Sequence, residues 1–206
     1  MNTPTIGFEA VEFSTPPPDP ISLAQIWFAD ALASNVCEPG ALALATVDAE
    51  GHAFNRIMQV LDIRDTGFIF TTHKGSKKGR HLTQTGWASG VLYWREKGRQ
   101  LILTGHARPL PDEESDTLWA TRPMGTRPMS SIAKQSEPLL NENALRAKAA
   151  KLNQCDQQLP RPRSFTGYLL EAQFVEFWQA DPRDRLHKRL LYTQSNSGWR
   201  TVRLQP

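Results

Sequence analysis

The stretch ALALATVDAEGHAFNRIMQVLDIRDTGFIFTTHKGSKKGR, residues 41–80, carries the strongest fold signal in this chain. β-type runs at residues 41–47, 55–63 and 68–72 alternate in it with short polar turns. Parallel strands need a long crossover, whereas short turns suit antiparallel hairpins. The stretch therefore predicts three antiparallel strands followed by a basic loop.

The rest of the sequence extends this pattern into a mainly β fold with peripheral helices. Apolar and alternating runs predict further strands at 88–94, 100–107, 168–178, 190–193 and 199–204. A closed or partly closed antiparallel barrel is the simplest way to remove the exposed edges of these strands. Helical patterns predict helices at 20–34, 78–83, 112–120 and 141–154, and prolines make 122–138 irregular.

The N-terminal residues differ in composition from the rest of the chain. Residues 1–20 hold four prolines after position 15 and little periodic apolar content, which predicts an extended or poorly ordered arm. Asp19 and Pro20 form a helix start, with aspartate as N-cap and proline at the first helical position. A single domain is expected over residues 21–206.

Charge and cysteine usage narrow the class of protein. The net charge of +3 is a mild basic excess, which favours anionic ligands without demanding nucleic acid. Cys37 and Cys155 form no CxxC or CxxH unit, so we expect free thiols and neither a disulfide framework nor a metal site. No apolar run approaches the ~20 residues of a membrane helix, which predicts a cytoplasmic chain with no membrane partner.

The basic loop after the third strand is a candidate anion site. Residues 71–80 combine the hydroxyls of Thr71, Thr72 and Ser76 with two glycines and the lysines Lys77 and Lys78. Backbone N–H groups at such a turn, with lysines beside them, suit a phosphate. The glycines are too close together for a Walker P-loop. A solvated surface loop is the alternative.

Other polar side chains are candidates for the same kind of site. Arg56 lies inside a β-type run, and it either points outward or meets a buried anion. Gln100, Gln135-Ser136 and Trp178 suit a binding site, with structural hydrogen bonding or packing as the alternative.

A late basic cluster spans residues 183–189. On an extended segment Arg185, His187 and Arg189 would share one face and could converge on anionic groups, or they could protect a solvated edge strand. The chain has no GxSxG, HExxH or CxxC motif. A site rich in cations and amides therefore suggests a redox cofactor that brings its own chemistry.

Several short motifs occur together and in order: Arg56-Ile57-Met58-Gln59, Phe70-Thr71-Thr72, Gly75-Ser76-Lys77-Lys78, Arg99-Gln100, Arg122-Pro123, Lys134-Gln135-Ser136, Glu176-Phe177-Trp178-Gln179 and Arg185-Leu186-His187-Lys188-Arg189. From about residue 22 to residue 206, the series resembles the pyridoxamine 5′-phosphate oxidase family. The resemblance implies an FMN-binding split β-barrel, antiparallel and of Greek-key type. It also implies a homodimer with FMN at the subunit interface.

The resemblance also implies roles for individual residues. The FMN phosphate would be held by Arg56, Ser76, Lys77 and Lys78, with Thr71 and Thr72 nearby. Cofactor contacts would also come from Ile57, Met58, Gln59, Gln100, Gln135, Ser136, Trp178 and Arg189, some of them from the second subunit. Substrate would be contacted by Arg122, Thr126, Arg185 and His187. No side chain is expected to be catalytic, because the flavin carries the chemistry.

Departures from the family pattern indicate the substrate. Leu61 and Leu118 stand where the vitamin-forming enzymes place a lysine and a tyrosine for the substrate phosphate, and leucine offers no donor. Met129-Ser130-Ser131 replaces a bulkier Gly-Ala-Trp, which should enlarge the pocket. These features resemble the phenazine-biosynthesis flavin oxidase branch. That branch implies aromatisation of a partly reduced phenazine carboxylic acid, with O2 as electron acceptor and H2O2 as product.

Two other classes of function remain open at this point. The first is a true pyridoxamine/pyridoxine 5′-phosphate oxidase, against which Leu61 and Leu118 argue. The second is a non-enzymatic barrel that binds flavin, or nucleic acid through the basic loop and aromatic side chains. A small-molecule substrate and no nucleic-acid partner are expected.

Overall fold

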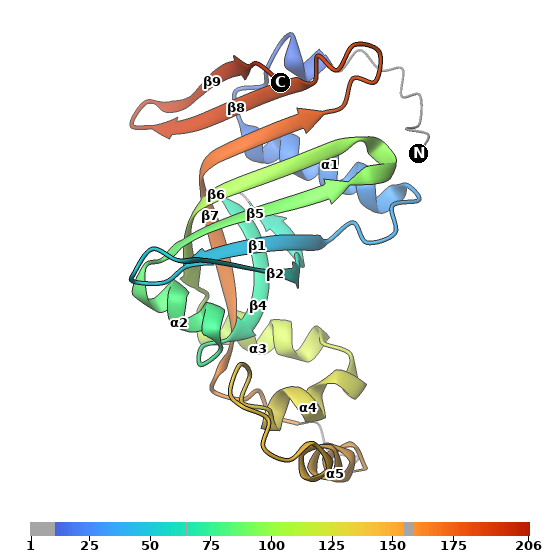
Figure 1. Ribbon diagram of the computed structural model, residues 1–206, viewed down its shortest axis with the longest axis vertical. Helices are drawn as coiled ribbons and strands as arrows, with labels where there is room; N and C mark the ends of the chain where they lie inside the picture. The colour runs from blue at the N-terminus through green and yellow to red at the C-terminus, as the bar shows by residue number, and fades with distance from the viewer. Residues whose placement is uncertain (1–10, 65, 155–158) are drawn as a thin grey trace.

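A single antiparallel sheet organises the molecule (Figure 1). The structure is a computed structural model that describes residues 11–64, 66–154 and 159–206. The strands are β1 Ala41–Val47, β2 Ala53–Gln59, β3 Asp62–Arg64, β4 Gly67–His73, β5 Trp87–Trp94, β6 Arg99–Pro109, β7 Phe165–Gln179, β8 Lys188–Ser195 and β9 Gly198–Leu204. They pair in the order β2-β1-β5-β6-β7-β4-β3, and β8 joins β7 and carries β9. The predicted mainly β, antiparallel fold is confirmed.

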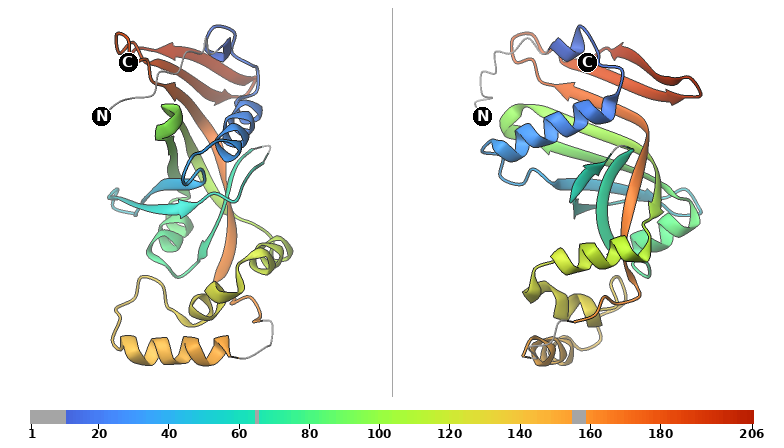
Figure 2. Two further views of the ribbon diagram at one scale, coloured as in Figure 1. Left: turned by 90° about the vertical axis from the view of Figure 1, so that its right-hand side faces the viewer. Right: turned by 180° about the vertical axis from the view of Figure 1, so that it is seen from behind.

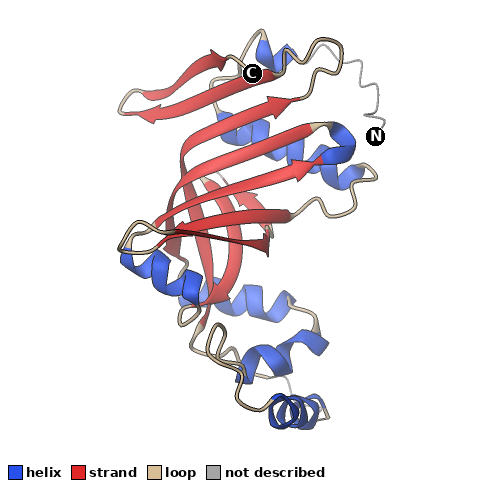
Figure 3. Ribbon diagram, in the orientation of Figure 1, coloured by secondary structure: helices blue, strands red, loops and turns tan. Residues whose placement is uncertain are grey.

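The helices lie around this sheet rather than inside it (Figure 3). They are α1 Pro20–Ala33, α2 Lys77–Gln84, α3 Asp112–Thr121, α4 Arg127–Ile132 and α5 Glu142–Asn153, with short 3₁₀ turns at Val11–Phe13, Arg95–Lys97 and Met124–Thr126. Helices α3 to α5 gather at one end of the sheet, and the β8–β9 hairpin lies at the other (Figure 2). None of the helices in the described ranges is long and apolar enough to span a bilayer.

Alternation along the strands places the core. In β1, Leu42, Leu44 and Thr46 are fully buried, while the residues that alternate with them are partly exposed. Helix α1 covers this core with Trp27, whose ring meets Phe177 of β7 edge-on at a centroid distance of 5.0 Å. Its start is the predicted one, because the Asp19 side chain accepts hydrogen bonds from the backbone N–H groups of Ile21 and Ser22.

The prediction of one strand over residues 55–63 is wrong, because the chain forms the two strands β2 and β3 there. β2 pairs with β1 and β3 pairs with β4. At the break, the Val60 N–H donates to the Gly40 carbonyl and the Leu61 N–H donates to the Ile69 carbonyl. The chain thus changes partner within two residues, which no periodicity reveals because both partners are distant in sequence.

Two expected irregular segments are ordered. Residues 11–19 pack on the barrel, because Phe13 is buried and its carbonyl accepts a 2.9 Å hydrogen bond from Arg203 Nη1. Tyr192 Oη donates to the Pro17 carbonyl at 2.9 Å. The remaining arm residues, 1–10, lie outside the described residues. Residues 122–138 contain helix α4, whose proline sits in the first turn, where a missing N–H is tolerated.

The barrel bends sharply where β6 meets β7. Their register shifts between Thr104 and Gly105, which is the signature of a β-bulge. A Cβ at Gly105 would lie 1.8 Å from the Glu171 carbonyl oxygen, so only glycine permits this approach of the two backbones. The bulge turns the long β7 from the helical end of the molecule toward the β8–β9 end.

Only one of the two cysteines lies within the described residues. Cys37 is exposed and is a free thiol, as predicted. Cys155 lies outside the described residues.

Candidate functional site

A cavity of about 630 Å³ lies between the β1–β2 hairpin, β4, the start of α2 and the α3–α4 segment. Eight of the fourteen predicted cofactor residues and one predicted substrate residue line it. Its lining is Glu38, Ala41, Arg56, Ile57, Met58, Gln59, Thr71, Thr72, His73, Lys78, Arg122, Ser130, Gln135 and Phe165.

Two cations meet in this cavity without a carboxylate partner. Arg56 uses Nη1 to donate to the Leu44 carbonyl at 3.0 Å and to Thr46 Oγ1 at 2.8 Å. Lys78 Nζ donates to Gln135 Oε1 at 2.8 Å and lies 3.4 Å from Ser76 Oγ. Among the described residues, neither cation forms an ion pair. Burial, with Arg56 as a second cause, lowers the pKa of Lys78 to about 8. The pair is therefore ready to bind an anion.

Lys78 belongs to the first turn of α2, so the positive end of this helix dipole lies beside the cavity. Ser76 is the N-cap, and its hydroxyl accepts a hydrogen bond from the Gly79 N–H at 3.2 Å. A Cβ at Gly79 would lie 2.4 Å from the His73 carbonyl oxygen, so glycine lets the loop close tightly on β4. The turn carries lysines where helices normally carry acidic residues, which adds to the positive end of the helix dipole.

Of the predicted loop residues, Thr71, Thr72 and Lys78 line the cavity, whereas Lys77 does not. Its ammonium lies over the Phe54 ring, 3.4 Å from the centroid, and outside the cavity lining. Its backbone N–H donates to Ser136 Oγ at 3.0 Å, and Ser136 has a positive φ of 75°. Thr72 Oγ1 lies 3.4 Å from Ser76 Oγ and 3.5 Å from Gln135 Oε1. The loop and the 134–136 segment therefore hold each other in place.

Arg122 also lines the cavity. Its guanidinium lies 5.7 Å from the Phe165 ring centroid, and its Nε is buried without a hydrogen-bond partner. Burial lowers the pKa of Arg122. Arg127 fixes the backbone here by donating to the carbonyls of Arg122 at 3.0 Å and Ala120 at 2.7 Å. Thr126, predicted beside Arg122, is exposed, bonds the Pro123 carbonyl and does not line the cavity.

His73 is a cavity residue that the sequence reasoning missed. Its ring nitrogens lie 2.9 Å from Ser164 Oγ and 2.9 Å from Ser130 Oγ. Burial lowers the pKa of His73, and the nearby charges of Arg122 and Lys78 lower it further. Its place at the end of a buried strand, next to the basic loop, was the available signal.

The leucines that replace phosphate ligands offer the cavity no polar group. Leu61 is 44% exposed, and Leu118 packs against a small buried cluster of Ile69, Leu110 and Leu169. Neither lines the cavity.

The other predicted site residues form a second cluster. Gln100, Trp178 and Arg189 are opposite one another on β6, β7 and β8. The Trp178 ring lies 4.8 Å from the His187 ring, and Arg189 Nε is bonded to Glu176 Oε1 at 2.7 Å.

The prediction that the segment before β8 is extended is wrong. Residues 182–184 form a turn, and Arg185 has a left-handed φ of 64°. The turn is held by Asp181, whose carboxylate accepts from Arg183, and by the Asp181 N–H, which donates to His187 Nδ1 at 3.1 Å. Arg185, His187 and Arg189 therefore do not form one face of a strand.

One chain cannot bring the two clusters together. Phe165 lines the cavity at the start of β7, and Trp178 lies thirteen residues later near its end. At roughly 3.3 Å per strand residue the two are about 40 Å apart along the strand. Figure 1 shows the same separation, with α2 at one end of β7 and β8 at the other.

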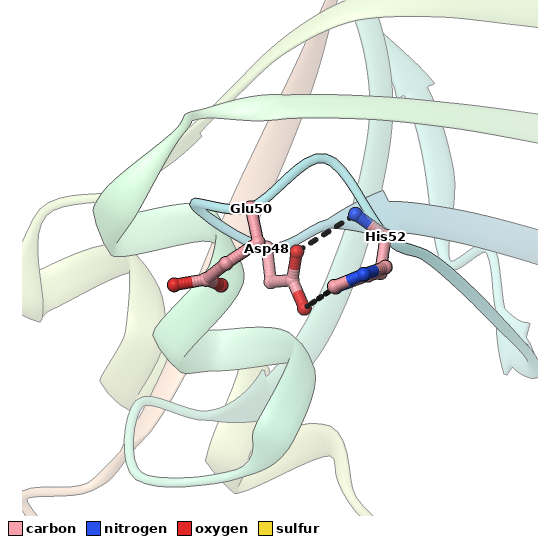
Figure 4. A group of neighbouring side chains, drawn as sticks. All are labelled: Asp48, Glu50 and His52. Atoms are coloured by element: carbon pink, nitrogen blue, oxygen red, sulfur yellow. Dashed lines mark hydrogen bonds and ion pairs between the residues drawn. The ribbon is translucent and has the colours of Figure 1, made fainter.

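A group of Asp48, Glu50 and His52 lies on the β1–β2 turn (Figure 4). The Asp48 carboxylate accepts from the His52 backbone N–H at 2.8 Å and from the His52 ring at 3.2 Å. These contacts close the turn between the two strands, and they explain why Asp48 and His52 lie close together.

Comparison with known proteins agrees with this geometry. A family model described as pyridoxamine 5′-phosphate oxidase matches residues 28–156, and one described as pyridoxine 5′-phosphate oxidase C-terminal dimerisation region matches residues 165–206. The chain is 48% identical to a dihydrophenazinedicarboxylate synthase from Burkholderia lata, over 95% of this chain and 92% of that protein. It is 37% identical to a pyridoxine/pyridoxamine 5′-phosphate oxidase from Burkholderia thailandensis, over 92% and 90%.

A crystal structure of PhzG from Burkholderia lata 383, in complex with tetrahydrophenazine-1-carboxylic acid, superposes with a TM-score of 0.94. It is 46% identical in sequence, and the superposition covers 100% of both chains. With two family models spanning most of its length and relatives this similar, the chain belongs to the pyridoxamine 5′-phosphate oxidase family.

Proposed function

We propose that this protein is an FMN-dependent oxidase of phenazine biosynthesis that aromatises a partly reduced phenazine carboxylic acid. The observation that carries the proposal is the cavity lined by Arg56, Lys78 and Arg122, none of which forms an ion pair with a carboxylate among the described residues. Such a cavity suits a ligand with a phosphate and a second ligand with a carboxylate.

The residues present fit FMN. Arg56, Lys78 and the Ser76-capped start of α2 would hold its phosphate, with Thr72 and Gln135 completing the ring of donors. When bound, FMN supplies the hydride acceptor, and dioxygen regenerates it with release of hydrogen peroxide.

The complete site is proposed to form between two subunits. Gln100, Trp178, Arg189, Arg185 and His187 are too far from the cavity of their own chain to act on the same ligand. A second copy can supply them, and the match of residues 165–206 to a dimerisation region supports a homodimer. Each interface would then combine the cavity of one chain with the β7–β8 cluster of its partner.

The substrate end of the cavity suits a carboxylate on a wide ring system. Leu61 and Leu118 provide no donors for a substrate phosphate. Met129-Ser130-Ser131, of which Ser130 lines the cavity, stands where the resemblance places a bulkier Gly-Ala-Trp. Arg122, already desolvated and with a free Nε, is the proposed carboxylate ligand. The partner chain's Arg185 and His187 are proposed to complete the substrate site.

The protein's own contribution is orientation. Aromatisation of the substrate ring drives its oxidation, so no strong protein base is required. Arg122 would fix the substrate carboxylate, and Phe165, against which its guanidinium packs, would keep that charge away from water. His73, held between two serine hydroxyls, would keep α4 and β4 together at the cavity wall.

Oxygen consumption with matched substrates tests this proposal. The purified protein should release FMN on denaturation, which would leave the nucleic-acid alternative without support. It should consume oxygen with a reduced phenazine-1-carboxylate at a rate well above that with pyridoxine 5′-phosphate. Equal or faster turnover of pyridoxine 5′-phosphate would contradict the assignment, and bound flavin without turnover of either substrate would indicate a flavin-binding protein.

A substitution at Arg122 tests the proposed contact between this residue and the substrate carboxylate. Arg122→Gln should raise KM for the phenazine carboxylate by roughly tenfold or more, because a charge-assisted contact is lost. Flavin content should stay at the wild-type level. An unchanged KM would remove Arg122 from the substrate site.

A further inference from the structure

Behind Arg56 lies a buried pair of polar side chains that the proposed oxidation does not use. Thr46 on β1 is fully buried, and His81 on α2 is 5% exposed. The Thr46 hydroxyl lies 3.1 Å from His81 Nδ1 and accepts a 2.8 Å hydrogen bond from Arg56 Nη1. The three side chains form a chain of contacts from the cavity wall to the helix behind it.

The chemistry of the three groups sets the direction of these hydrogen bonds. A guanidinium can only donate, so the Thr46 oxygen accepts from Arg56. The single Thr46 proton is then free to be donated to His81 Nδ1, which accepts it when Nδ1 is the unprotonated nitrogen of a neutral imidazole. Burial lowers the pKa of His81, as do Arg56, Lys77 and Arg80, while Asp48 opposes them. A neutral imidazole is the form this environment favours.

The same contacts determine which nitrogens of the Arg56 guanidinium stay free for a ligand in the cavity. Arg56 and Leu44 are directly opposite in the β1–β2 register, and the Leu44 carbonyl also accepts from Nη1. Both hydrogen bonds that Arg56 makes within the described residues thus use one nitrogen. Its Nε and Nη2 remain available to the cavity.

His81 is itself held firmly. Its ring packs on Phe54 of β2 with centroids 5.1 Å apart, and the same Phe54 ring lies beneath the Lys77 ammonium. The helix that carries His81 also carries Ser76 and Lys78, so Thr46 and His81 connect the two halves of the anion site. One half comes from the β1–β2 hairpin and the other from α2.

We infer that Thr46 and His81 are positioning residues that hold Arg56 in the orientation required for the phosphate of the flavin. The inference rests on the proposed function, because it assigns FMN to the cavity. It predicts that the pair controls affinity for FMN and leaves affinity for riboflavin, which lacks the phosphate, almost unchanged.

Binding of FMN and riboflavin to the flavin-stripped full-length protein tests the inference by fluorescence titration. Thr46→Val, which keeps the shape and removes the hydroxyl, should weaken FMN binding about tenfold, in the range of one lost hydrogen bond to a charged group. Thr46→Ser should restore binding to within about threefold, because the hydroxyl returns. Riboflavin affinity should change less than about twofold in either variant.

The helix side of the contact has its own pair of variants. His81→Asn places an amide oxygen near the position of Nδ1 and should keep FMN affinity close to that of the wild type. His81→Leu removes the acceptor and should weaken FMN binding by about fivefold or more. Thr193→Val on β8, a threonine outside the cavity, is the control for a generic loss of a strand hydroxyl. Circular dichroism of each variant checks its folding.

The outcomes distinguish failure of this inference from failure of the proposed function on which it rests. If the wild type binds neither FMN nor riboflavin, the proposed function fails. If the wild type binds FMN and Thr46→Val binds it equally well, the inference alone fails. Equal loss of FMN and riboflavin affinity would also overturn it, because that pattern indicates damage to the whole cavity. If Thr46→Val does not fold, the comparison of His81→Asn with His81→Leu decides.

Discussion

Burial of Lys78 lowers the free energy of unfolding, but it favours the binding of an anion. The side chain is 8% exposed and lies near Arg56, and its pKa is lowered to about 8 from the ordinary lysine value of 10.5. A lowered lysine pKa means that the charged form is less stable in the folded protein than in the unfolded chain. The folded state carries this cost below pH 8, and it disappears as pH rises from about 8 to 10.5. An anion in the cavity would remove the same cost.

The first prediction concerns the stability of the flavin-free protein. Lys78→Met should raise its free energy of unfolding at pH 7 by about 2 kcal/mol, less than the full pKa shift implies because the bond to Gln135 is lost. The gain should shrink as pH approaches 10. Urea unfolding at pH 7 and pH 10 measures both values. A variant less stable than the wild type at pH 7 would contradict the prediction.

The second prediction concerns pH and binding. FMN affinity should fall as pH rises above about 8, because Lys78 then loses its proton in the free protein but must be charged to bind phosphate. The limiting slope is about tenfold per pH unit. Titrations from pH 7 to 9.5 measure it, with riboflavin and Lys78→Met as controls that should lack the dependence. Parallel loss of FMN and riboflavin affinity would point to another group.

At the scale of the element, α1 depends on its N-cap. Asp19 accepts hydrogen bonds from the Ile21 and Ser22 N–H groups at 3.0 and 2.9 Å, and from the Ser22 hydroxyl. Partial burial opposes these bonds, yet the net effect lowers the pKa of Asp19. The stabilisation is therefore present above the unfolded-state pKa and is lost as pH falls through the folded-state pKa. The helix start covers the core through Trp27 and Phe28.

The third prediction follows from this cap. Asp19→Ala should lower the free energy of unfolding by about 1 kcal/mol at pH 7, whereas Asp19→Asn, which keeps an acceptor, should lose only part of this. Thermal unfolding of the three proteins at pH 7 measures the effect. Repeating it near pH 3 should reduce the difference between aspartate and alanine. Equal stability of Asp19→Ala and the wild type at pH 7 would refute the role of the cap.

At the scale of the whole molecule, one face of the sheet is apolar and uncovered. Ile57, Ala43, Val91 and Ile102 form a continuous row across β2, β1, β5 and β6. Ile57 is 66% exposed, and Tyr93 on the same face is 57% exposed. Ala43, Val91 and Ile102 are partly exposed, and a continuous apolar row of this kind is typical of a protein interface. Gln100 and Trp178 lie on the same face, so the surface that would form the dimer also carries the second half of the proposed site.

The fourth prediction joins assembly to cofactor binding. Ile102→Glu should convert the dimer into a monomer and should abolish FMN retention, because each site would lose the residues supplied by the partner chain. Light scattering coupled to gel filtration measures the mass, and the absorbance spectrum measures the flavin. Thr201→Glu on the exposed β9 is the control. A monomer that still retains stoichiometric FMN would contradict the composite site.

The local signals in the sequence determined most of the elements and the position of the candidate anion loop. Alternation marks β1, β5 and β6, aspartate followed by proline marks the start of α1, and glycines, hydroxyls and lysines mark the candidate anion loop. Each signal is complete within about ten residues, because strand period, capping and turn formation depend on near neighbours. The local patterns left the role of Arg56 open, and the family resemblance predicted that it acts together with Lys78; both residues line the same cavity.

Only the tertiary structure decided which strands pair and which side chains meet. The exchange of partners between β2 and β3 and the entry of His73 into the cavity both depend on contacts with residues far along the chain. Strand pairing and core packing set those contacts, and no local pattern encodes them. The separation of the predicted site residues into two clusters at opposite ends of β7 has the same origin.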